Sequence, residues 1–415
     1  MRVIPLRLIA LAIALCGTVS GCGKTLSPKA VEHSSGPVAA VSAHGAGGLS
    51  TKNTTRLGGS GSAVDAAAVA VAVYPGLTSA TRPQAVALVD GRDWPAALAA
   101  STLAGRPLHA PLLYSDGGVL PEASSQALRA MGPTGVGAPG AAAIASLGGA
   151  QVIQVGATAT SPGYVTRSIT GNGSAALAVE IERIASALRH PAPRQLIVTA
   201  ADGAPAMTMP AAGLAAQMGA PILFVSRSGI PRATSAELAR LGRPSIYIVG
   251  PSTVVGENVA SELERYGRVT RISGPDPARN AIAVARFTDG AFGWGVVEPG
   301  HGLVFASASR PLDGPAAAPL SATGDYGPLL LLESPDRVPA ALGSYLSDLQ
   351  PGSPPSGPVH GVYNHGWLIG DEGAISASTQ ASLDARLEIT PRPAAEPPIA
   401  SATTPAGKPT QTTGP

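Results

Sequence analysis

Three short apolar stretches decide the fold of this chain. They are VALVD at 86–90, LIVTA at 196–200 and LVFAS at 303–307. A proline lies 25 residues after the start of each stretch and opens a second apolar run. These second runs are PLLY at 111–114, PILF at 221–224 and PLLL at 328–331. Because the same spacing occurs three times, the sequence indicates three tandem copies of one unit.

A third apolar run that ends in glycine completes each copy. These runs are VIQVG at 152–156, IYIVG at 246–250 and WLIG at 367–370. Helices are expected at 121–131, 232–241 and 336–349, and none is expected directly after Gly156. Runs of Val, Ile and Leu that alternate with helices are typical of a parallel sheet buried on both faces. The predicted fold class is therefore α/β: three tandem, small, doubly wound (Rossmann-like) units with mainly parallel sheets, in a pseudo-threefold arrangement.

The composition excludes several classes of protein. The chain has 415 residues, of which 45% are hydrophobic, 13% charged and 4% aromatic, whereas about 25% of an average soluble domain is charged. The core must therefore consist of small aliphatic side chains. The 28 Lys and Arg residues against 26 Asp and Glu residues give a net charge of +2. This balance excludes a polybasic protein that binds nucleic acid.

The first 22 residues have the layout of an export signal. Arg2 and Arg7 precede an apolar run at 8–15 that is too short to span a bilayer. The following VSGC at 19–22 resembles a bacterial lipobox, so we expect cleavage of a signal peptide at 1–21 and lipidation of Cys22; the alternative is an ordinary cleaved signal. Both cysteines of the chain, at 16 and 22, lie here. The rest of the chain therefore has no disulfide, zinc–thiolate site or cysteine nucleophile.

The chain divides further by composition. A segment rich in Ser, Gly, Ala and Lys follows the signal and is expected to be a flexible tether, because it cannot bury enough apolar surface to offset its conformational entropy. A tail rich in Pro and Thr is expected to be disordered. The expected divisions are a tether at 22–55, repeat units at 56–168, 169–270 and 271–389, and a tail at 390–415.

The repeated pattern resembles the cell wall-binding repeat 2 family, which occurs as three tandem copies on surface proteins of Gram-positive bacteria. The resemblance lies in an Arg–aliphatic–x–Gly opening motif, RLGG at 56–59 and RISG at 271–274, with ITG at 169–171 keeping part of it. It also lies in WPAAL at 94–98, where Ala96 replaces the family's aspartate. The resemblance covers about four-fifths of the chain, and each copy is degenerate. It implies attachment to the cell wall without catalysis.

Arginines are the candidate residues for binding an anionic polymer. Positions 224–286 carry nine arginines against five acids, whereas 300–390 carry three against nine. The planar guanidinium donates two hydrogen bonds at once to a phosphate or carboxylate, so arginines of the second unit are favoured together with the two of the opening motifs. The candidates are Arg56, Arg227, Arg232, Arg240, Arg243 and Arg271. The alternatives are a structural ion pair for Arg56 and Arg271, and scattered charges that form no patch.

A second candidate site lies at the ends of the first strands, where doubly wound sheets place ligands. Asp90, Asp93, Asp202 and Asp313 fall there, although aspartate also forms turns. GVGAPG at 135–140 fits a phosphate-loop pattern but follows no strand, so we read it as a surface loop. His360 and His365 lack a carboxylate or thiol at metal-ligand spacing. No metal, cofactor or catalytic residue is therefore expected.

These observations favour a binding protein. We expect an extracytoplasmic protein, anchored to the cell membrane by lipid and facing the cell wall, that binds anionic cell-wall polymer or a peptidoglycan-linked glycan. It is expected to be a monomer with an internal pseudo-trimer. The alternatives are a solute-binding lipoprotein of a transport system, which three like units disfavour, and a cell-wall hydrolase, which the lack of a catalytic region outside the repeats disfavours.

Overall fold

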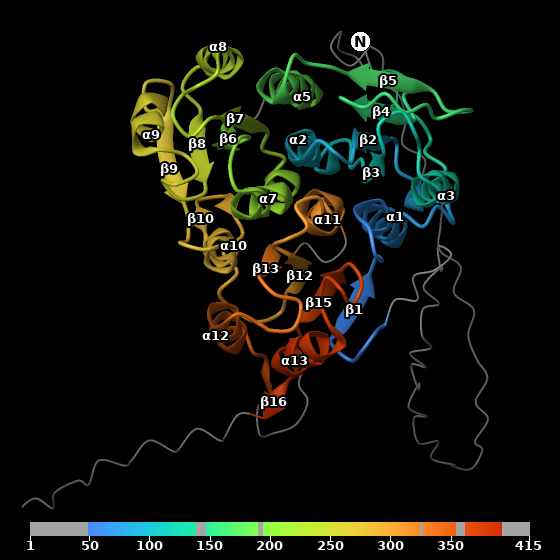
Figure 1. Ribbon diagram of the computed structural model, residues 1–415, viewed down its shortest axis with the longest axis vertical. Coiled ribbons are helices and arrows are strands. Elements are labelled where there is room, and N and C mark those ends of the chain that lie inside the picture. Colours follow the sequence, from blue (N-terminus) through green and yellow to red (C-terminus); the bar gives the residue numbers. More distant parts are fainter. Residues whose placement is uncertain (1–48, 138–146, 190–193, 324–326, 354–361, 392–415) are drawn as a thin grey trace, which may run out of the picture. The chain divides into compact units, whose positions relative to one another are not determined.

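The computed structural model describes residues 49–137, 147–189, 194–323, 327–353 and 362–391. Helices alternate with strands along these ranges, and the strands form separate, mainly parallel sheets (Figure 1). The signal peptide, Cys22 and the tether up to residue 48 lie outside the described residues. His190 and His360 also lie outside them.

The first sheet consists of β2 (Val86–Asp90), β3 (Leu112–Ser115), β4 (Val152–Val155) and β5 (Thr166–Ile169). Its strands are parallel and follow the order β3-β2-β4-β5. The proline before β3 fits this register, because its carbonyl accepts the Ala87 amide while its own missing N–H lies outside the ladder. The strand expected at 86–90 is thus the central strand of a parallel sheet.

The second sheet repeats this order. It consists of β6 (Gln195–Ala200), β7 (Ile222–Val225), β8 (Ser245–Val249) and β9 (Arg268–Ile272). The strands are parallel and follow the order β7-β6-β8-β9. The crossovers from the central strand run to both sides, which creates a topological switch point between β6 and β8.

The third sheet has the same order but draws one strand from the start of the folded chain. It consists of β12 (Gly302–Ser307), β13 (Leu329–Leu332), β15 (His365–Ile369) and β1 (Thr54–Leu57), in the order β13-β12-β15-β1. Strand β1 pairs in parallel with β15, so Arg56 lies opposite Leu368. The expected division, in which the first repeat unit begins at residue 56, does not include this pairing. Strand β1, at the start of the folded chain, completes the last sheet.

Helices cover both faces of each sheet. The helix after each opening motif is α1 (Ser62–Val73), α5 (Ser174–Leu188) or α10 (Pro277–Arg286). The helix after each first strand is α2 (Trp94–Ala104), α7 (Pro210–Met218, preceded by the short α6, Pro205–Thr208) or α11 (Asp313–Ala322). The remaining helices are α3 (Glu122–Met131), α8 (Arg232–Leu241), α12 (Ala340–Asp348), α9 (Glu257–Leu263) and α13 (Ala377–Leu387), besides a 3₁₀ turn at Ser79–Thr81. Two short pairs, β10–β11 (Thr288–Asp289, Phe292–Gly293) and β14–β16 (Gly352–Ser353, Thr390–Pro391), complete the elements.

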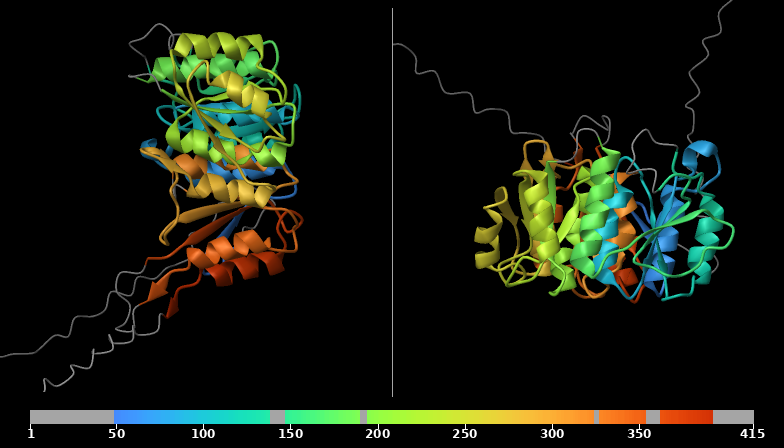
Figure 2. Two further views of the ribbon diagram at one scale, coloured as in Figure 1. Left: turned by 90° about the vertical axis from the view of Figure 1, so that its left-hand side faces the viewer. Right: turned by 90° about the horizontal axis from the view of Figure 1, so that it is seen from above.

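The inner helices α2, α7 and α11 explain the alanine-rich composition. Each of the three contacts the other two, and nearly all their residues are buried. A Cβ atom added to Gly105 would lie 2.3 Å from the Ala216 carbonyl oxygen, and one on Gly213 would lie 2.7 Å from Ser321 Oγ. Small side chains therefore permit the close approach of these helices, while the outer pair α12 and α13 lies side by side (Figure 2). The pseudo-threefold axis itself stays a prediction.

Most of the expected elements are present, with two differences in the helices. The nine expected apolar runs match strands, and no helix follows Gly156 within the described residues 157–165. Helix α12 begins at Ala340 and not at 336, because Pro339 would lack its donor inside a helix and acts as the residue before the first turn. Helices α6 and α7 are separate short helices that meet at Met209.

Two segments expected to lack structure are ordered in part. Asn53 and Thr54, assigned to the tether at 22–55, are buried, and the Asn53 amide donates to Asp384 Oδ1 at 2.7 Å. The hydrogen-bond partners of this polar segment lie on α13, more than 300 residues away. The local composition therefore could not show that the segment is ordered. Thr390 and Pro391, assigned to the tail at 390–415, form β16 against β14. Residues 392–415 lie outside the described residues.

Candidate functional site

The opening-motif arginine Arg56 is buried beneath the turn that follows β15. Its guanidinium donates to the carbonyls of Gly370 (3.0 Å), Asp371 (2.8 Å) and Ile375 (2.7 Å). Both Nε and Nη2 donate to Gln380 Oε1 at 3.2 and 2.9 Å. All five N–H groups of Arg56 are therefore occupied. Arg56 holds the edge strand to the third sheet and has no donor left for a ligand.

Arg271 performs the same task in the second sheet. Its Nη1 donates to the Gly250 carbonyl at 3.0 Å and its Nη2 to the Val255 carbonyl at 2.9 Å. An exposed ion pair with Glu257 at 3.3 Å occupies the outer side. The side chain is only 19% exposed. The sequence left open a structural ion pair for both opening-motif arginines. Arg271 makes one with Glu257, whereas Arg56 is held by carbonyl and amide oxygens.

The other candidate arginines of the second unit do not form one cluster. Arg227 follows β7 and Arg232 begins α8, so they lie near one end of this helix. Arg243 follows the C-terminus of α8, and a ten-residue helix is about 15 Å long. Arg227, Arg232 and Arg243 are exposed and make no ion pair among the described residues. The exposed candidates without an ion pair therefore fall into two neighbours, Arg227 and Arg232, and a separate residue, Arg243.

Arg240 belongs to a charged network between α5 and α8. It pairs with Glu182 Oε2 at 2.9 Å and also with Glu237, while Arg183 pairs with Glu237 Oε2 at 3.0 Å. Both glutamates are fully buried. Burial and a hydrogen bond to Glu237 raise the pKa of Glu182 to about 7. Burial opposes ionisation of Glu237 as well, but hydrogen bonds from Glu182 and Arg240 outweigh it and lower that pKa.

The strand-end carboxylates of the first and second sheets differ. Asp90 accepts from Arg92 Nε at 3.0 Å and Nη2 at 2.6 Å, and these hydrogen bonds lower its pKa to about 2. Asp93 caps α2 by accepting the Ala96 amide at 2.9 Å, which is the ordinary role of an N-cap aspartate. Asp202 is exposed after β6 and makes no side-chain hydrogen bond or ion pair among the described residues.

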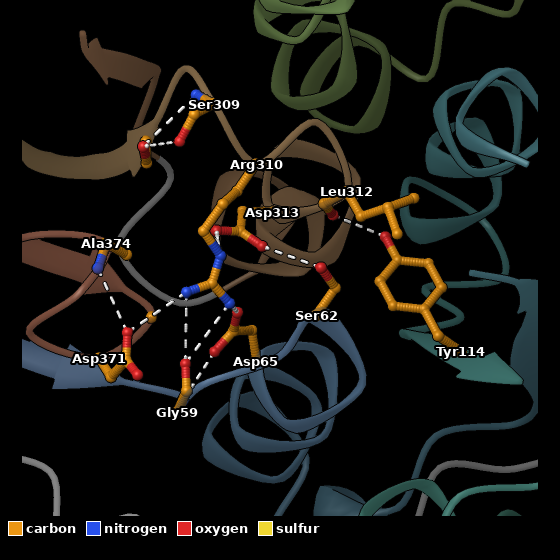
Figure 3. Close-up of polar contacts among 12 residues, drawn as sticks. Gly59, Ser62, Asp65, Tyr114, Ser309, Arg310, Leu312, Asp313, Asp371 and Ala374 are labelled. Atoms are coloured by element: carbon orange, nitrogen blue, oxygen red, sulfur yellow. Dashed lines mark hydrogen bonds and ion pairs between the residues drawn. The ribbon is translucent and has the colours of Figure 1, made fainter. Parts of the chain in front are cut away.

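Asp313 lies in a buried group of charges at the switch point of the third sheet (Figure 3). Arg310 points between three carboxylates: its Nε is 3.0 Å from Asp313 Oδ2, its Nη1 is 3.4 Å from Asp371 Oδ1, and its Nη2 pairs with Asp65. Asp65 and Asp313 are fully buried, whereas Arg310 is 19% exposed. We call these four residues, Asp65, Arg310, Asp313 and Asp371, the closing cluster.

The closing cluster joins the start of the folded chain to its end. Asp65 is on α1, Arg310 and Asp313 flank the beginning of α11, and Asp371 follows β15. The Ser62 hydroxyl is 3.5 Å from Asp313 Oδ1, and Tyr114 donates to the Leu312 carbonyl at 2.7 Å beside it. One guanidinium thus faces three carboxylates in a buried place, which leaves excess negative charge if all of them ionise.

Burial dominates the titration of the two inner carboxyls. It raises the pKa of Asp313 to about 8, and the charge of Asp65 adds to this effect. It also raises the pKa of Asp65 to about 6, against the attraction of Arg310. With a pKa of about 8, Asp313 holds its proton at neutral pH and so relieves part of the excess charge, whereas Asp65 is mostly ionised there. The closing cluster therefore connects α1, α11 and the turn after β15 through charged groups, and the number of protons it binds changes near neutral pH.

Asp65 is a key residue that the sequence reading missed. Its Oδ1 accepts the Gly59 amide at 2.7 Å, and six residues separate the two. Asn280 accepts the Gly274 amide at 2.9 Å across the same spacing, and its Nδ2 donates to the Met207 carbonyl at 2.6 Å. In the second unit the equivalent position is Leu177. A polar side chain six residues after the glycine of the opening motif was the signal that could have identified these contacts.

The histidines among the described residues do not form a metal site. His365 begins β15, and its Nε2 is 3.2 Å from Thr55 Oγ1, while His109 Nδ1 is 3.2 Å from Thr323 Oγ1. No group of three or more His, Cys, Asp or Glu residues could hold a metal ion within the described ranges.

In the same part of the chain, no helix has the length and apolar character needed to cross a membrane.

Comparison with known proteins places this geometry among related folds. No family model matches the chain. Two solved structures share the fold. Cwp6 from Clostridium difficile has a TM-score of 0.62 at 17% identity and covers 81% of this chain. Cwp8 from the same organism has a TM-score of 0.60 at 18% identity and also covers 81%. The match spans 48% and 52% of those chains, so it shows the fold of about half of each.

A curated protein is similar over a shorter stretch. The "Amidase enhancer" of Bacillus subtilis (strain 168) is 30% identical over 131 residues, which is 32% of this chain and 17% of that protein. The match therefore spans less than a fifth of the relative's length. The shared α/β fold with mainly parallel sheets agrees with the repeated units expected from the sequence.

Proposed function

We propose that this chain is a non-catalytic cell-envelope protein that binds anionic cell-wall polymer through its α/β units. The observation that carries the proposal is the exposed pair Arg227 and Arg232 at the strand-end side of the second sheet, without ion-pair partners among the described residues. Guanidinium groups in this state keep their donors for phosphate or carboxylate groups. Arg243 offers a second contact at the opposite end of α8.

The comparisons support an association with the cell wall. The fold is shared with Cwp6 and Cwp8 over 81% of the chain. The opening motifs of the sequence add a resemblance to the cell wall-binding repeat 2 family, although no family model matches the chain. The partial similarity to a protein named amidase enhancer supports a role beside wall enzymes and not as one. Three of the four strand-end carboxylates add to this view, because Asp90 is ion-paired, Asp93 caps a helix and Asp313 is buried, whereas Asp202 is exposed.

We also propose that Cys22 carries a lipid that anchors the mature chain outside the cytoplasmic membrane. Each buried methylene of an acyl chain contributes about 0.8 kcal/mol, and several chains together make such anchoring stable. Cys22→Ala should therefore move the protein from the membrane fraction to the soluble fraction. A variant that stays membrane-bound in high salt would contradict the lipid anchor. The protein is proposed to act as a monomer.

A binding assay on purified wall sacculi tests the proposed function. The soluble chain from residue 23 is incubated with intact sacculi and with sacculi from which the secondary polymer has been removed. We expect it to sediment with the intact sacculi and to stay in solution with the stripped ones. Equal binding to both preparations would contradict recognition of the anionic polymer, and release of soluble wall fragments would contradict the non-catalytic role.

A further inference from the structure

A polar pocket of about 370 Å³ lies at the edge of the third sheet, apart from the arginines of the second unit. It lies between the start of α10 and the loop from β13 to α12. Asp276, Arg279, Glu333, Arg337, Val338 and Ala340 line it. Its volume falls within the range of about 300–1,000 Å³ that is typical of small-molecule sites.

The pocket holds two opposite charges that do not pair with each other. Glu333 and Arg337 are exposed, belong to one loop, and make no side-chain hydrogen bond or ion pair among the described residues. The other charged pair of the pocket is committed: Asp276 accepts the Arg279 amide at 2.8 Å and pairs with its guanidinium. The carboxylate of Glu333 and the guanidinium of Arg337 therefore both line the pocket and remain available to bind a ligand.

The loop does not need these charges in order to fold. In this turn the backbones of Ser334 and Arg337 form an isolated bridge, and Asp116 and Val119 form the corresponding bridge after β3. After β7, the Ser226 amide donates to the Gly229 carbonyl at 2.9 Å in the same place. Neither of these other two turns carries an unpaired carboxylate opposite an unpaired guanidinium. The two charges are therefore a feature of the third unit and not a requirement of the turn.

We propose that this pocket binds a zwitterion with the size of an amino acid or a short peptide end. The guanidinium of Arg337 binds its carboxylate, and the carboxylate of Glu333 binds its ammonium group. The first turn of α12, which has no side-chain cap, adds partial positive charge on the side of Arg337 and so fixes the orientation. Charge-assisted hydrogen bonds at both ends discriminate against a ligand that lacks either charge.

Calorimetric titration of the soluble chain from residue 23 with alanyl-alanine tests this site. The dipeptide carries both charges, whereas its N-acetyl form carries only the negative charge and its amide only the positive one. We expect saturable binding of alanyl-alanine and at least tenfold weaker binding of both blocked forms. No saturable binding of the dipeptide, or equal binding of either blocked form, would overturn the proposal.

Variants of the loop place the binding in this pocket. Glu333→Gln and Arg337→Gln should each weaken the binding of alanyl-alanine at least tenfold, because each removes one charge that faces the ligand. Asp336→Asn changes an exposed residue of the same loop that does not line the pocket, and should leave binding unchanged. Binding that persists in both glutamine variants would overturn the site. Sacculus binding does not depend on this result, so failure here is distinct from failure of the proposed function.

Discussion

Two junctions between repeat units are both formed by a pair of packed helices, but one contains buried charges and the other is apolar. Where the last unit meets the first, α1 packs on α11 through the closing cluster, with two fully buried aspartates around Arg310. Where the first unit meets the second, α5 packs on α2, and the position equivalent to Asp65 is the apolar Leu177. The first junction depends on charge and protons, whereas the second depends on apolar burial. The two should therefore respond differently to mutation and to pH.

The largest effect is expected from Arg310→Ala. This change leaves three carboxylates, two of them buried, without their shared cation, and breaking a buried ion pair costs about 3–5 kcal/mol. The free energy of unfolding, measured with a denaturant, should fall by about that amount. Arg337→Ala, which removes an exposed arginine nearby in the sequence, is the control and should change it by less than about 0.5 kcal/mol. Equal effects of the two variants would refute the stabilising role of the closing cluster.

A smaller loss is expected from Leu177→Ala at the apolar junction. Leu177 is 4% exposed, and truncation of a buried leucine costs about 2–5 kcal/mol. We expect the lower part of this range, because the residue lies at an interface between helices. The loss should be the same at pH 6 and pH 8.5, since no titrating group is removed. A loss that changed with pH would show that the two junctions are not independent.

The dependence of stability on pH distinguishes the junctions most directly. Burial raises the pKa of Asp65 to about 6 and that of Asp313 to about 8, whereas aspartate in an unfolded chain titrates near 3.9. Unfolding above about pH 4 therefore releases protons. This contribution to stability is complete below about pH 4 and is lost as the pH rises from there through about 6 for Asp65 and about 8 for Asp313.

We therefore expect the free energy of unfolding to fall between about pH 4 and pH 8, by at most about 1.4 kcal/mol per pH unit for each proton released. Asp313→Asn, which mimics the protonated group, should flatten this dependence. Glu122→Gln on α3 removes an exposed carboxylate and serves as the control. An unchanged slope in Asp313→Asn would show that the closing cluster does not bind the proton.

The sequence predicted the central strands because they are continuous apolar runs at a fixed spacing. It did not predict the edge strands β5, β9 and β1, whose sequences are TRSI, RVTRI and TTRL. These strands are short and polar, and each is defined by a neighbour that local patterns do not reveal; for β1 the neighbour is more than 300 residues away. The opening motif, read as the start of a unit, is in fact the end of an edge strand and the turn after it.

The candidate site was predictable only in part. The charge imbalance correctly marked the second unit as rich in arginine, but the sequence could not show that Arg56 is buried or that Arg240 faces buried glutamates. The candidate aspartates all lie after the carboxyl end of a first strand, as the topology predicts, but their environments differ. Asp202 is exposed and Asp313 is buried, because only the third sheet receives Asp65 and Ser62 from a distant helix.

The central claim is that the exposed arginines Arg227 and Arg232 bind anionic wall polymer. It is tested by sedimentation with intact sacculi at a series of salt concentrations, comparing the double variant Arg227→Ala/Arg232→Ala with the soluble wild-type chain. Arg129→Ala/Arg167→Ala removes two exposed arginines of the first unit and matches the change in charge. Wild type and control should bind, and should weaken as salt rises through about 0.15 M, where the Debye length is about 8 Å. The Arg227/Arg232 variant should lose most of its binding at every salt concentration, whereas binding that equals the control would contradict the account.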